Sequence, residues 1–130
     1  MEQARLMVVR PDEAASPPGP PTPGMDRRQL LDDESCWVGW VRTDPGLAGG
    51  WHHHGTRDSY IYVLRGTVTI EYGPGGHEQV TAVAGDFIFN PALMVHREIT
   101  ASDEPAEFFV VRVGTGAQNV NVDGPDVYAS

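Results

Sequence analysis

Three histidines in two short segments have the types and spacing that could bind a metal ion. His52 and His54 are two positions apart, so in an extended strand both imidazoles project from the same face. His53 then points to the other face, unless a β-bulge shifts the alternation. His96 lies in a second segment, residues 85–96, which has the pattern strand, turn, strand. Together these imidazoles predict a site for one divalent transition metal ion, with iron, nickel, manganese, copper and zinc as candidates.

The first segment is similar to the first sequence motif of the cupin family, which has the form G-x5-H-x-H-x4-E-x6-G. Gly46, His52, His54 and Gly66 fall in register with this motif. Ser59 stands where the motif has its glutamate. The chain therefore has the two histidine ligands that the motif implies, but not the anionic one.

The second segment is similar to the second cupin motif, G-x5-P-x-G-x2-H-x3-N. Gly85, Pro91 and His96 match, whereas Leu93 and Thr100 replace the glycine and the asparagine of the motif. The two motifs occur in the family's order, and the resemblance covers about residues 35–114. It implies an all-β, double-stranded β-helix (jelly-roll) barrel that holds the metal ion between its two sheets.

Ser59 leaves open how the metal site is completed, because a neutral hydroxyl cannot easily replace a carboxylate ligand. A three-histidine site would leave positions open to water, dioxygen or substrate, as in some cupin dioxygenases. Alternatively a nearby carboxylate compensates, and Asp58 and Glu98 are the candidates. In the third interpretation metal binding is weak or absent, and the barrel binds an organic ligand instead.

Glu98 is two positions after His96 and therefore shares its strand face. An inward carboxylate in a barrel needs a partner to offset its desolvation. Glu98 is then an acceptor for a histidine ring, a general base or, if the strand twists, a surface residue. Asp58 is better explained as a turn residue between His54 and the next strand. We take Glu98 and Ser59 as the candidate catalytic residues.

Short segments rich in β-branched and aromatic residues recur along the chain, with turn residues between them. No segment has the periodicity of an amphipathic helix. This pattern predicts a β-sandwich or barrel, in agreement with the cupin resemblance. We expect strands at residues 28–31, 37–42, 51–54, 59–64, 67–72, 79–83, 87–89, 95–100 and 107–113.

A single domain accounts for a chain of 130 residues. Residues 1–24 form an N-terminal strand at 6–9 and a proline-rich arm with little that could build a core. Residues 25–116 form the cupin barrel. Residues 117–130 form a C-terminal tail, in which the presence of one further edge strand stays open.

Side-chain alternation assigns residues to the inside or the outside of the barrel. Ser59 has the same parity as Ile61 and Val63, which is consistent with an inward position for the serine. Large aromatic side chains are expected to pack in the barrel and not to form a substrate cage. These are Trp37, Trp40, Trp51, Phe87 and Phe89.

Composition excludes several classes of partner and mechanism. The formal net charge of −9 argues against nucleic acid and against an anionic membrane surface as partners. All nine basic residues are arginine, so a lysine Schiff base is excluded. The single cysteine cannot form an intramolecular disulfide, and no apolar stretch is long enough for a signal-peptide core or a membrane span. We expect a cytoplasmic protein.

The resemblance and the site together predict a metal-dependent oxygenase that acts on a small organic molecule. Two alternatives stay open: a non-catalytic, ligand-sensing cupin, and a metal-assisted isomerase or cyclase. Catalysis itself is therefore an open question, since the fold alone separates none of these functions. A homodimer is expected, because cupins often pair their barrels through terminal strands.

Overall fold

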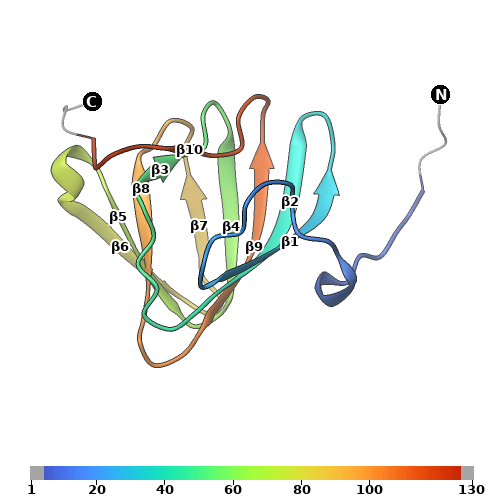
Figure 1. The fold of residues 1–130 in the computed structure, drawn as a ribbon, viewed down its shortest axis with the longest axis horizontal. Coiled ribbons are helices and arrows are strands. Elements are labelled where there is room, and N and C mark those ends of the chain that lie inside the picture. Colours follow the sequence, from blue (N-terminus) through green and yellow to red (C-terminus); the bar gives the residue numbers. More distant parts are fainter. Residues whose placement is uncertain (1–4, 127–130) are drawn as a thin grey trace.

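The computed structural model describes residues 5–126, whose strands form two antiparallel sheets that face each other (Figure 1). Sheet A has the strand order β1-β2-β9-β4-β7, and sheet B has the order β10-β3-β8-β5-β6. This architecture confirms the predicted all-β, double-stranded β-helix (jelly-roll) fold. The strands are β1 (Met25–Asp32), β2 (Cys36–Thr43), β3 (His52–His53), β4 (Asp58–Arg65), β5 (Thr67–Tyr72), β6 (Glu78–Val83), β7 (Phe87–Asn90), β8 (His96–Thr100), β9 (Ala106–Val113) and β10 (Val120–Asn121), with short 3-10 turns η1 (Pro11–Glu13) and η2 (Pro74–Gly76).

Strict alternation of buried and more exposed residues identifies which face of sheet A is turned toward the barrel interior. In β2 the side of the strand that carries Trp37, Val41 and Thr43 is buried, and the residues between them are more exposed. The predicted alternation of β4 is also confirmed, since Ser59 and Val63 are buried while Tyr60 and Tyr62 are exposed. Inward parity therefore assigns Ser59 to the barrel interior.

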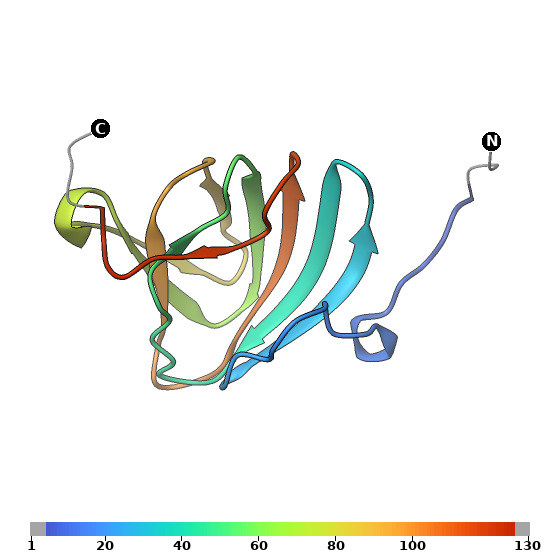
Figure 2. The same cartoon turned by 45° about the horizontal axis from the view of Figure 1, so that its top comes forward.

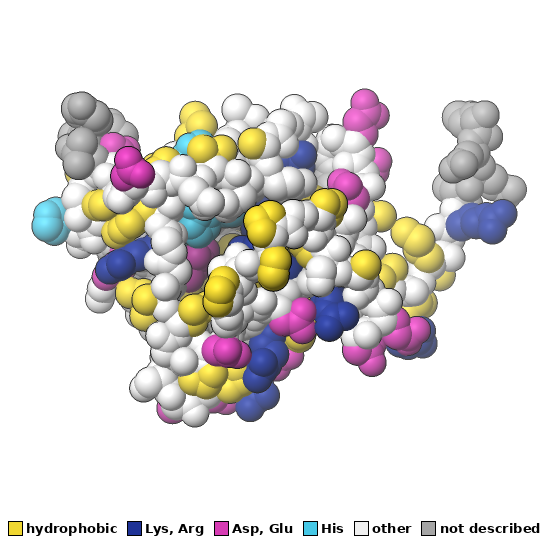
Figure 3. Space-filling view, viewed as in Figure 1, with side chains coloured by type: hydrophobic (Ala, Val, Ile, Leu, Met, Phe, Trp, Pro, Cys, Tyr) yellow, Lys and Arg dark blue, Asp and Glu magenta, His cyan; other side chains and the backbone are white. Residues whose placement is uncertain are grey.

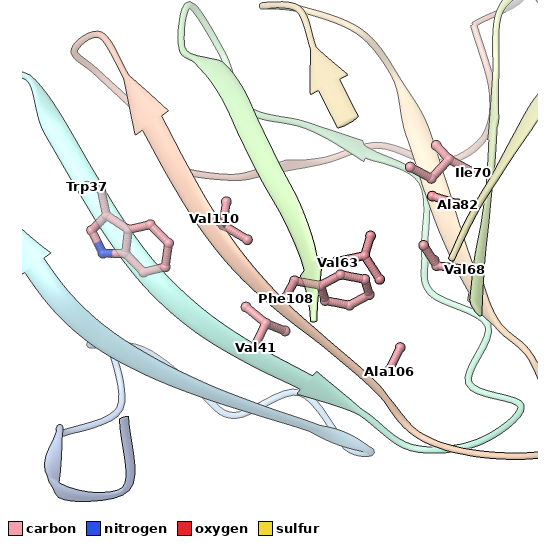
Figure 4. Close-up of a cluster of buried hydrophobic side chains, with 9 residues drawn as sticks. All are labelled: Trp37, Val41, Val63, Val68, Ile70, Ala82, Ala106, Phe108 and Val110. Carbon is pink, nitrogen blue, oxygen red and sulfur yellow. The ribbon is translucent and has the colours of Figure 1, made fainter. Parts of the chain in front are cut away.

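The hydrophobic core joins the inner faces of the two sheets (Figure 4). Sheet A contributes residues from β2, β4 and β9, and sheet B contributes residues from β5 and β6. A buried hydrogen bond of 2.7 Å between the hydroxyls of Thr43 and Thr100 links the sheets directly. Ala106, fully buried, pairs with Thr43 at the same end of the barrel. The core consists of Trp37, Val41, Val63, Val68, Ile70, Ala82, Ala106, Phe108 and Val110.

The N-terminal arm differs from the prediction. Residues 6–9 were expected to form a strand, but they are extended without sheet pairing, and Leu6 is 95% exposed. A strand needs a partner at a sheet edge, and this segment stands away from both sheets (Figure 1). The later part of the arm does contact β1, where the backbone N–H of Gln29 donates a hydrogen bond of 2.8 Å to the backbone carbonyl of Ala15.

The expected inward packing of two aromatic residues is wrong. Phe87 and Phe89 are 63% and 51% exposed, because they occupy the outward positions of β7, the edge strand of sheet A. Within β7, the neighbouring residues Ile88 and Asn90 face the interior of the barrel. Trp37, in contrast, is buried as expected.

The segment after residue 116 contributes a strand to the barrel. β10 pairs with β3 through Val120 with His53 and Asn121 with His52. Figure 2 shows this C-terminal segment, in red, running beside β3. The question of a further edge strand is thus answered, and residues of this segment lie next to the histidines. Within the described residues, no helix is long and apolar enough to cross a membrane.

Candidate metal centre

Sheet register brings the three predicted histidines together. His52 of β3 is the direct cross-strand partner of His96 of β8, and their ring centroids are 4.3 Å apart. His54 has the same parity as His52, and its ring centroid lies 5.0 Å from that of His52 and 5.2 Å from that of His96. One potential ligand atom from each residue lies within 4.8 Å of the other two. This spacing fits three donors around one ion.

Backbone carbonyls orient all three rings. The Nδ1 atoms of His52, His54 and His96 lie 2.9, 2.8 and 2.8 Å from carbonyl oxygens of Gly50, Gln118 and Met94 respectively. A carbonyl oxygen only accepts, so each Nδ1 carries the hydrogen and donates it. In a neutral ring the lone pair is then on Nε2, the atom left to bind a metal ion. The donor set therefore fits a divalent transition metal.

His53 is directed elsewhere, as the alternation predicts. Its Nδ1 accepts a hydrogen bond of 3.0 Å from the backbone amide of Gly55. It is not part of the group that could hold a metal ion. The glycine-rich stretch thus contains no bulge that would exchange the roles of His53 and its neighbours.

Glu98 is the carboxylate that faces the histidines. Its Oε1 lies 3.1 Å from Nε2 of His96, and its Oε2 lies 3.7 Å from Nε2 of His52. Asp58, the other candidate, instead accepts a hydrogen bond of 2.8 Å from the backbone amide of Ala92. Of the two carboxylates considered from the sequence, only Glu98 is placed to compensate for the missing glutamate.

Asp58 acts on the loop that precedes β8. Ala92 is fixed by the Asp58 carboxylate, and the amide of Leu93 donates to the Gly55 carbonyl at 2.8 Å. Leu93, at the motif's glycine position, has a φ of 64°. This left-handed conformation costs about 1–2 kcal/mol for a residue with a side chain. The hydrogen bonds of Ala92 and Leu93 hold this conformation, and the carbonyl of the next residue, Met94, orients His96.

The charges of Glu98 and His96 are coupled. Burial lowers the pKa of His96, but the hydrogen bond and the negative charge of Glu98 outweigh burial and raise it above the ordinary value. Burial likewise opposes ionisation of Glu98, yet His96 and then His52 hold the pKa of that carboxyl well below its usual range. Without a metal ion, the His96 ring faces an acceptor at both nitrogens, which suits the imidazolium. A metal ion at Nε2 would take the place of that proton.

The other two histidines are held neutral. Burial, together with the positive charge of Arg112, lowers the pKa of His54 to about 3. Burial also lowers the pKa of His52, although Glu98 acts in the opposite direction. Both rings are therefore in the protonation state that a metal ligand needs at neutral pH.

Ser59 lies in a polar row across the inner face of sheet A. It is the cross-strand partner of Asn90 on β7 and of Arg112 on β9. The residue is only 1% exposed, and its Oγ has no hydrogen-bond partner within the described structure. Nδ2 of Asn90 lies 3.2 Å from Nε2 of His96, so this row reaches the histidines.

A cavity of about 90 Å³ lies between the sheets beside these residues. Its polar lining includes His52, His54, Ser59 and Glu98. The volume admits several water molecules or the reactive end of a small organic molecule. The remaining lining is mainly apolar and includes Met25, Val41, Ile61, Val68, Ile70, Ile88, Phe108 and Val110.

Sequence reasoning missed Arg112 and Arg27, which also line this cavity. The signal for Arg112 was present, because it shares the parity of Phe108 and Val110 within the predicted strand 107–113. The carbonyl of Gln118 could not be found in this way, since no side-chain pattern marks a backbone acceptor that comes from a distant segment.

His54 provides a test of this electrostatic arrangement in the metal-free protein. Its pKa of about 3 in the folded state lies below that of an exposed histidine. The unfolded chain therefore binds the proton first, and stability falls as the pH is lowered. Between about pH 6 and about pH 5 this one group should lower the free energy of unfolding by about 1 kcal/mol per pH unit.

His54→Asn keeps a donor for the Gln118 carbonyl but cannot titrate. Urea unfolding of the EDTA-treated proteins should show a shallower loss of stability for the variant across this pH range. Equal pH slopes in the two proteins would contradict a neutral, buried His54.

Solved structures with the same fold support the architecture. An uncharacterized conserved protein with a double-stranded β-helix domain from Klebsiella pneumoniae has a TM-score of 0.70 and 21% identity, over 92% of this chain and 99% of that chain. The polyketide cyclase RemF from Streptomyces resistomycificus has a TM-score of 0.72 and 20% identity, over 92% of this chain and 88% of the cyclase. Bacillus subtilis oxalate decarboxylase, studied for its Mn(II) centres, has a TM-score of 0.68 and 19% identity, over 78% and 29% of the respective chains.

Sequence comparison gives the family. The search of curated proteins gives no match. The family model described as "Cupin domain" matches residues 39–112, which include all three clustered histidines, Ser59 and Glu98. The histidine cluster between two jelly-roll sheets agrees with this match, and the chain belongs to the cupin family.

Proposed function

We propose that this cupin binds one divalent transition metal ion through Nε2 of His52, His54 and His96 and is a metal-dependent oxygenase of a small organic molecule. The observation that carries the proposal is the set of three Nδ1–H hydrogen bonds to backbone carbonyls. These bonds leave Nε2 as the atom of each ring that can bind a metal ion, and one potential ligand atom from each ring lies within 4.8 Å of the other two.

The chemistry expected at the site follows from its donors. A bound ion would supply Lewis acidity and, if it is iron, copper or manganese, redox chemistry with dioxygen. Three neutral imidazoles leave the charge of the ion largely uncompensated, and Glu98 is the carboxylate within reach. The Mn(II) centres of oxalate decarboxylase are consistent with metal chemistry on this fold.

The chain's own residues have separate roles in this proposal. Apolar side chains of the cavity exclude water from the substrate. Glu98 accepts a proton from the substrate, because its carboxylate lines the cavity and lies beside His96. Ser59 has a free Oγ at the cavity and positions the substrate by a hydrogen bond.

Metal-assisted cyclisation or isomerisation is the second candidate. It is favoured by the likeness to the polyketide cyclase RemF and by the position of Glu98 as a base. Such a reaction needs proton transfer and Lewis acidity but no change of redox state.

Metal retention tests the ligand set. Protein incubated with a divalent ion and passed through a desalting column should retain about one ion per chain, measured by elemental analysis. His96→Ala should retain almost none, because a buried donor at the centre of the cluster is lost. His77→Ala is the control, since this histidine is exposed and outside the cluster. Stoichiometric metal in His96→Ala would contradict the proposed ligands.

Oxygen consumption separates the two candidate reactions. Anaerobically iron-loaded protein mixed with small diketones, thiols or phenols should consume dioxygen with at least one substrate class. Glu98→Gln should slow the reaction by about 10²–10⁴-fold if the carboxylate is the base. Product formation without oxygen uptake would favour cyclisation or isomerisation, and no turnover in any assay would leave a ligand-sensing cupin.

We also propose a homodimer, now with its contact at the outer face of sheet A. Tyr60, Tyr62, Phe87 and Phe89 lie there with exposures between 38% and 63%. Exposed aromatic clusters of this kind are typical of protein interfaces. Light scattering should give twice the chain mass of 14.1 kDa, and Phe87→Glu should shift the mass toward one chain. A wild-type mass of one chain would contradict the dimer.

A further inference from the structure

The guanidinium of Arg112 is a cation that lies inside the barrel. It lines the cavity together with His52 and His54, and its Nε is buried with no hydrogen-bond partner. Among the described residues, no carboxylate oxygen comes within the 4.0 Å ion-pair distance of its nitrogens. Its Cζ lies over the ring of Trp37, 4.9 Å from the ring centroid. A cation inside the barrel with a buried Nε and no ion-pair partner among the described residues needs an explanation.

The outer arginines differ from Arg112 in this respect. Arg28 pairs with Asp26 at 3.0 Å and Arg97 with Glu71 at 2.6 Å. Arg10, Arg42 and Arg65 also have carboxylate partners. The chain has twice as many acidic residues as basic ones, 18 against 9. Lack of acidic residues therefore cannot explain why Arg112 has no ion-pair partner within residues 5–126.

The neighbour of Arg112 shows why no carboxylate pairs directly with its guanidinium. Ser59, its cross-strand partner on β4, stands at the position where the cupin motif has glutamate. A glutamate there would place an anion next to the guanidinium. With serine, the buried Oγ of Ser59 and the buried Nε of Arg112 belong to paired positions of neighbouring strands at the cavity, and neither atom has a hydrogen-bond partner in the described structure.

Arg27 extends the same positive region. Arg27, Arg112 and Asn119 line both the histidine cavity and a second hollow of about 290 Å³, which reaches Trp37 and Pro18 of the N-terminal arm. Burial lowers the pKa of Arg112 to about 10, against the attraction of Glu98, and the charges of Arg27 and Arg57 add to this lowering. Basic, acidic and histidine side chains are visible together in the hollow of the face shown in Figure 3.

We propose that Arg112, with the Ser59 hydroxyl and Arg27, binds a carboxylate group of the substrate, which supplies the direct ion-pair partner that Arg112 lacks among the described residues. A guanidinium matches a carboxylate with two parallel N–H···O bonds. The apolar lining receives the rest of the molecule, with its reactive end beside the histidines. The inference names the substrate class of the proposed enzyme and rests on that function only for the identity of the ligand as a substrate.

Binding of small carboxylates to the metal-free protein tests this proposal without the metal site. Butanoate and benzoate, each compared with its amide, are titrated into EDTA-treated, 15N-labelled protein, and the Trp37 indole signal reports the site. At least one carboxylate should bind at least about tenfold more tightly than its amide, because hydrogen bonds to a charged group are lost with the amide. Equal affinities, or no binding by either acid, would overturn the proposal.

Variants locate the binding site. Arg112→Gln should weaken carboxylate binding at least about tenfold, whereas Arg65→Gln, which changes an exposed arginine, should leave it unchanged. Ser59→Glu keeps Arg112 and supplies an internal carboxylate, so it should abolish binding of the external one. Ser59→Glu also tests the proposal if Arg112→Gln fails to fold. Wild-type affinity in Arg112→Gln or in Ser59→Glu would overturn the proposal.

His96→Ala separates this inference from the proposed metal centre. The variant should lose metal retention but keep carboxylate binding at the wild-type level in metal-free protein. Loss of carboxylate binding in His96→Ala, with wild-type stability, would place the anion at the histidines and overturn the role of Arg112. Failure of metal retention in the wild type, with carboxylate binding intact, would overturn only the proposed metal centre.

Discussion

The orientation of three imidazole rings by backbone carbonyls is the constraint on which the candidate site depends. Gly50 precedes β3, Met94 precedes β8, and Gln118 precedes β10. All three strands are neighbours in sheet B, so the strand order of the sheet determines where the three carbonyls lie, and the carbonyls in turn orient the rings. Loss of the C-terminal strand would therefore release His54 even though the histidine itself is unchanged. The site belongs to the register of sheet B as much as to its side chains.

The two inner walls of the barrel carry opposite charges. Sheet B contributes Glu98 beside the histidines, and sheet A contributes Arg112 beside Ser59. In an interior of low effective dielectric constant, this separation favours a cation at one wall and an anion at the other. A metal ion and an anionic substrate satisfy both preferences. In the proposed binding mode, Ser59 in place of the motif glutamate leaves both the space and the positive charge of Arg112 available to an anionic ligand.

The sequence predicted those features that depend on local alternation or on motif order. The two-residue spacing of His52 and His54 and the second motif with His96 led to the cluster, and the strand segments were identified with small differences at their ends. The apolar run at 6–9 has the composition of a strand, but it has no sheet edge beside it. Alternation also cannot say which face of an edge strand is outside, and so Phe87 and Phe89 were misplaced. Pairing between distant strands decides the position of Arg112 next to Ser59, and this pairing is a property of the tertiary structure.

X-ray absorption spectroscopy of the protein loaded with one divalent ion tests the central claim most directly. With zinc, the spectrum should show three imidazole nitrogens at about 2.0–2.1 Å, accompanied by oxygen donors from Glu98, water or substrate. Multiple scattering from three imidazole rings would distinguish these ligands from other nitrogen or oxygen donors. A first coordination sphere with one imidazole or none would contradict the account.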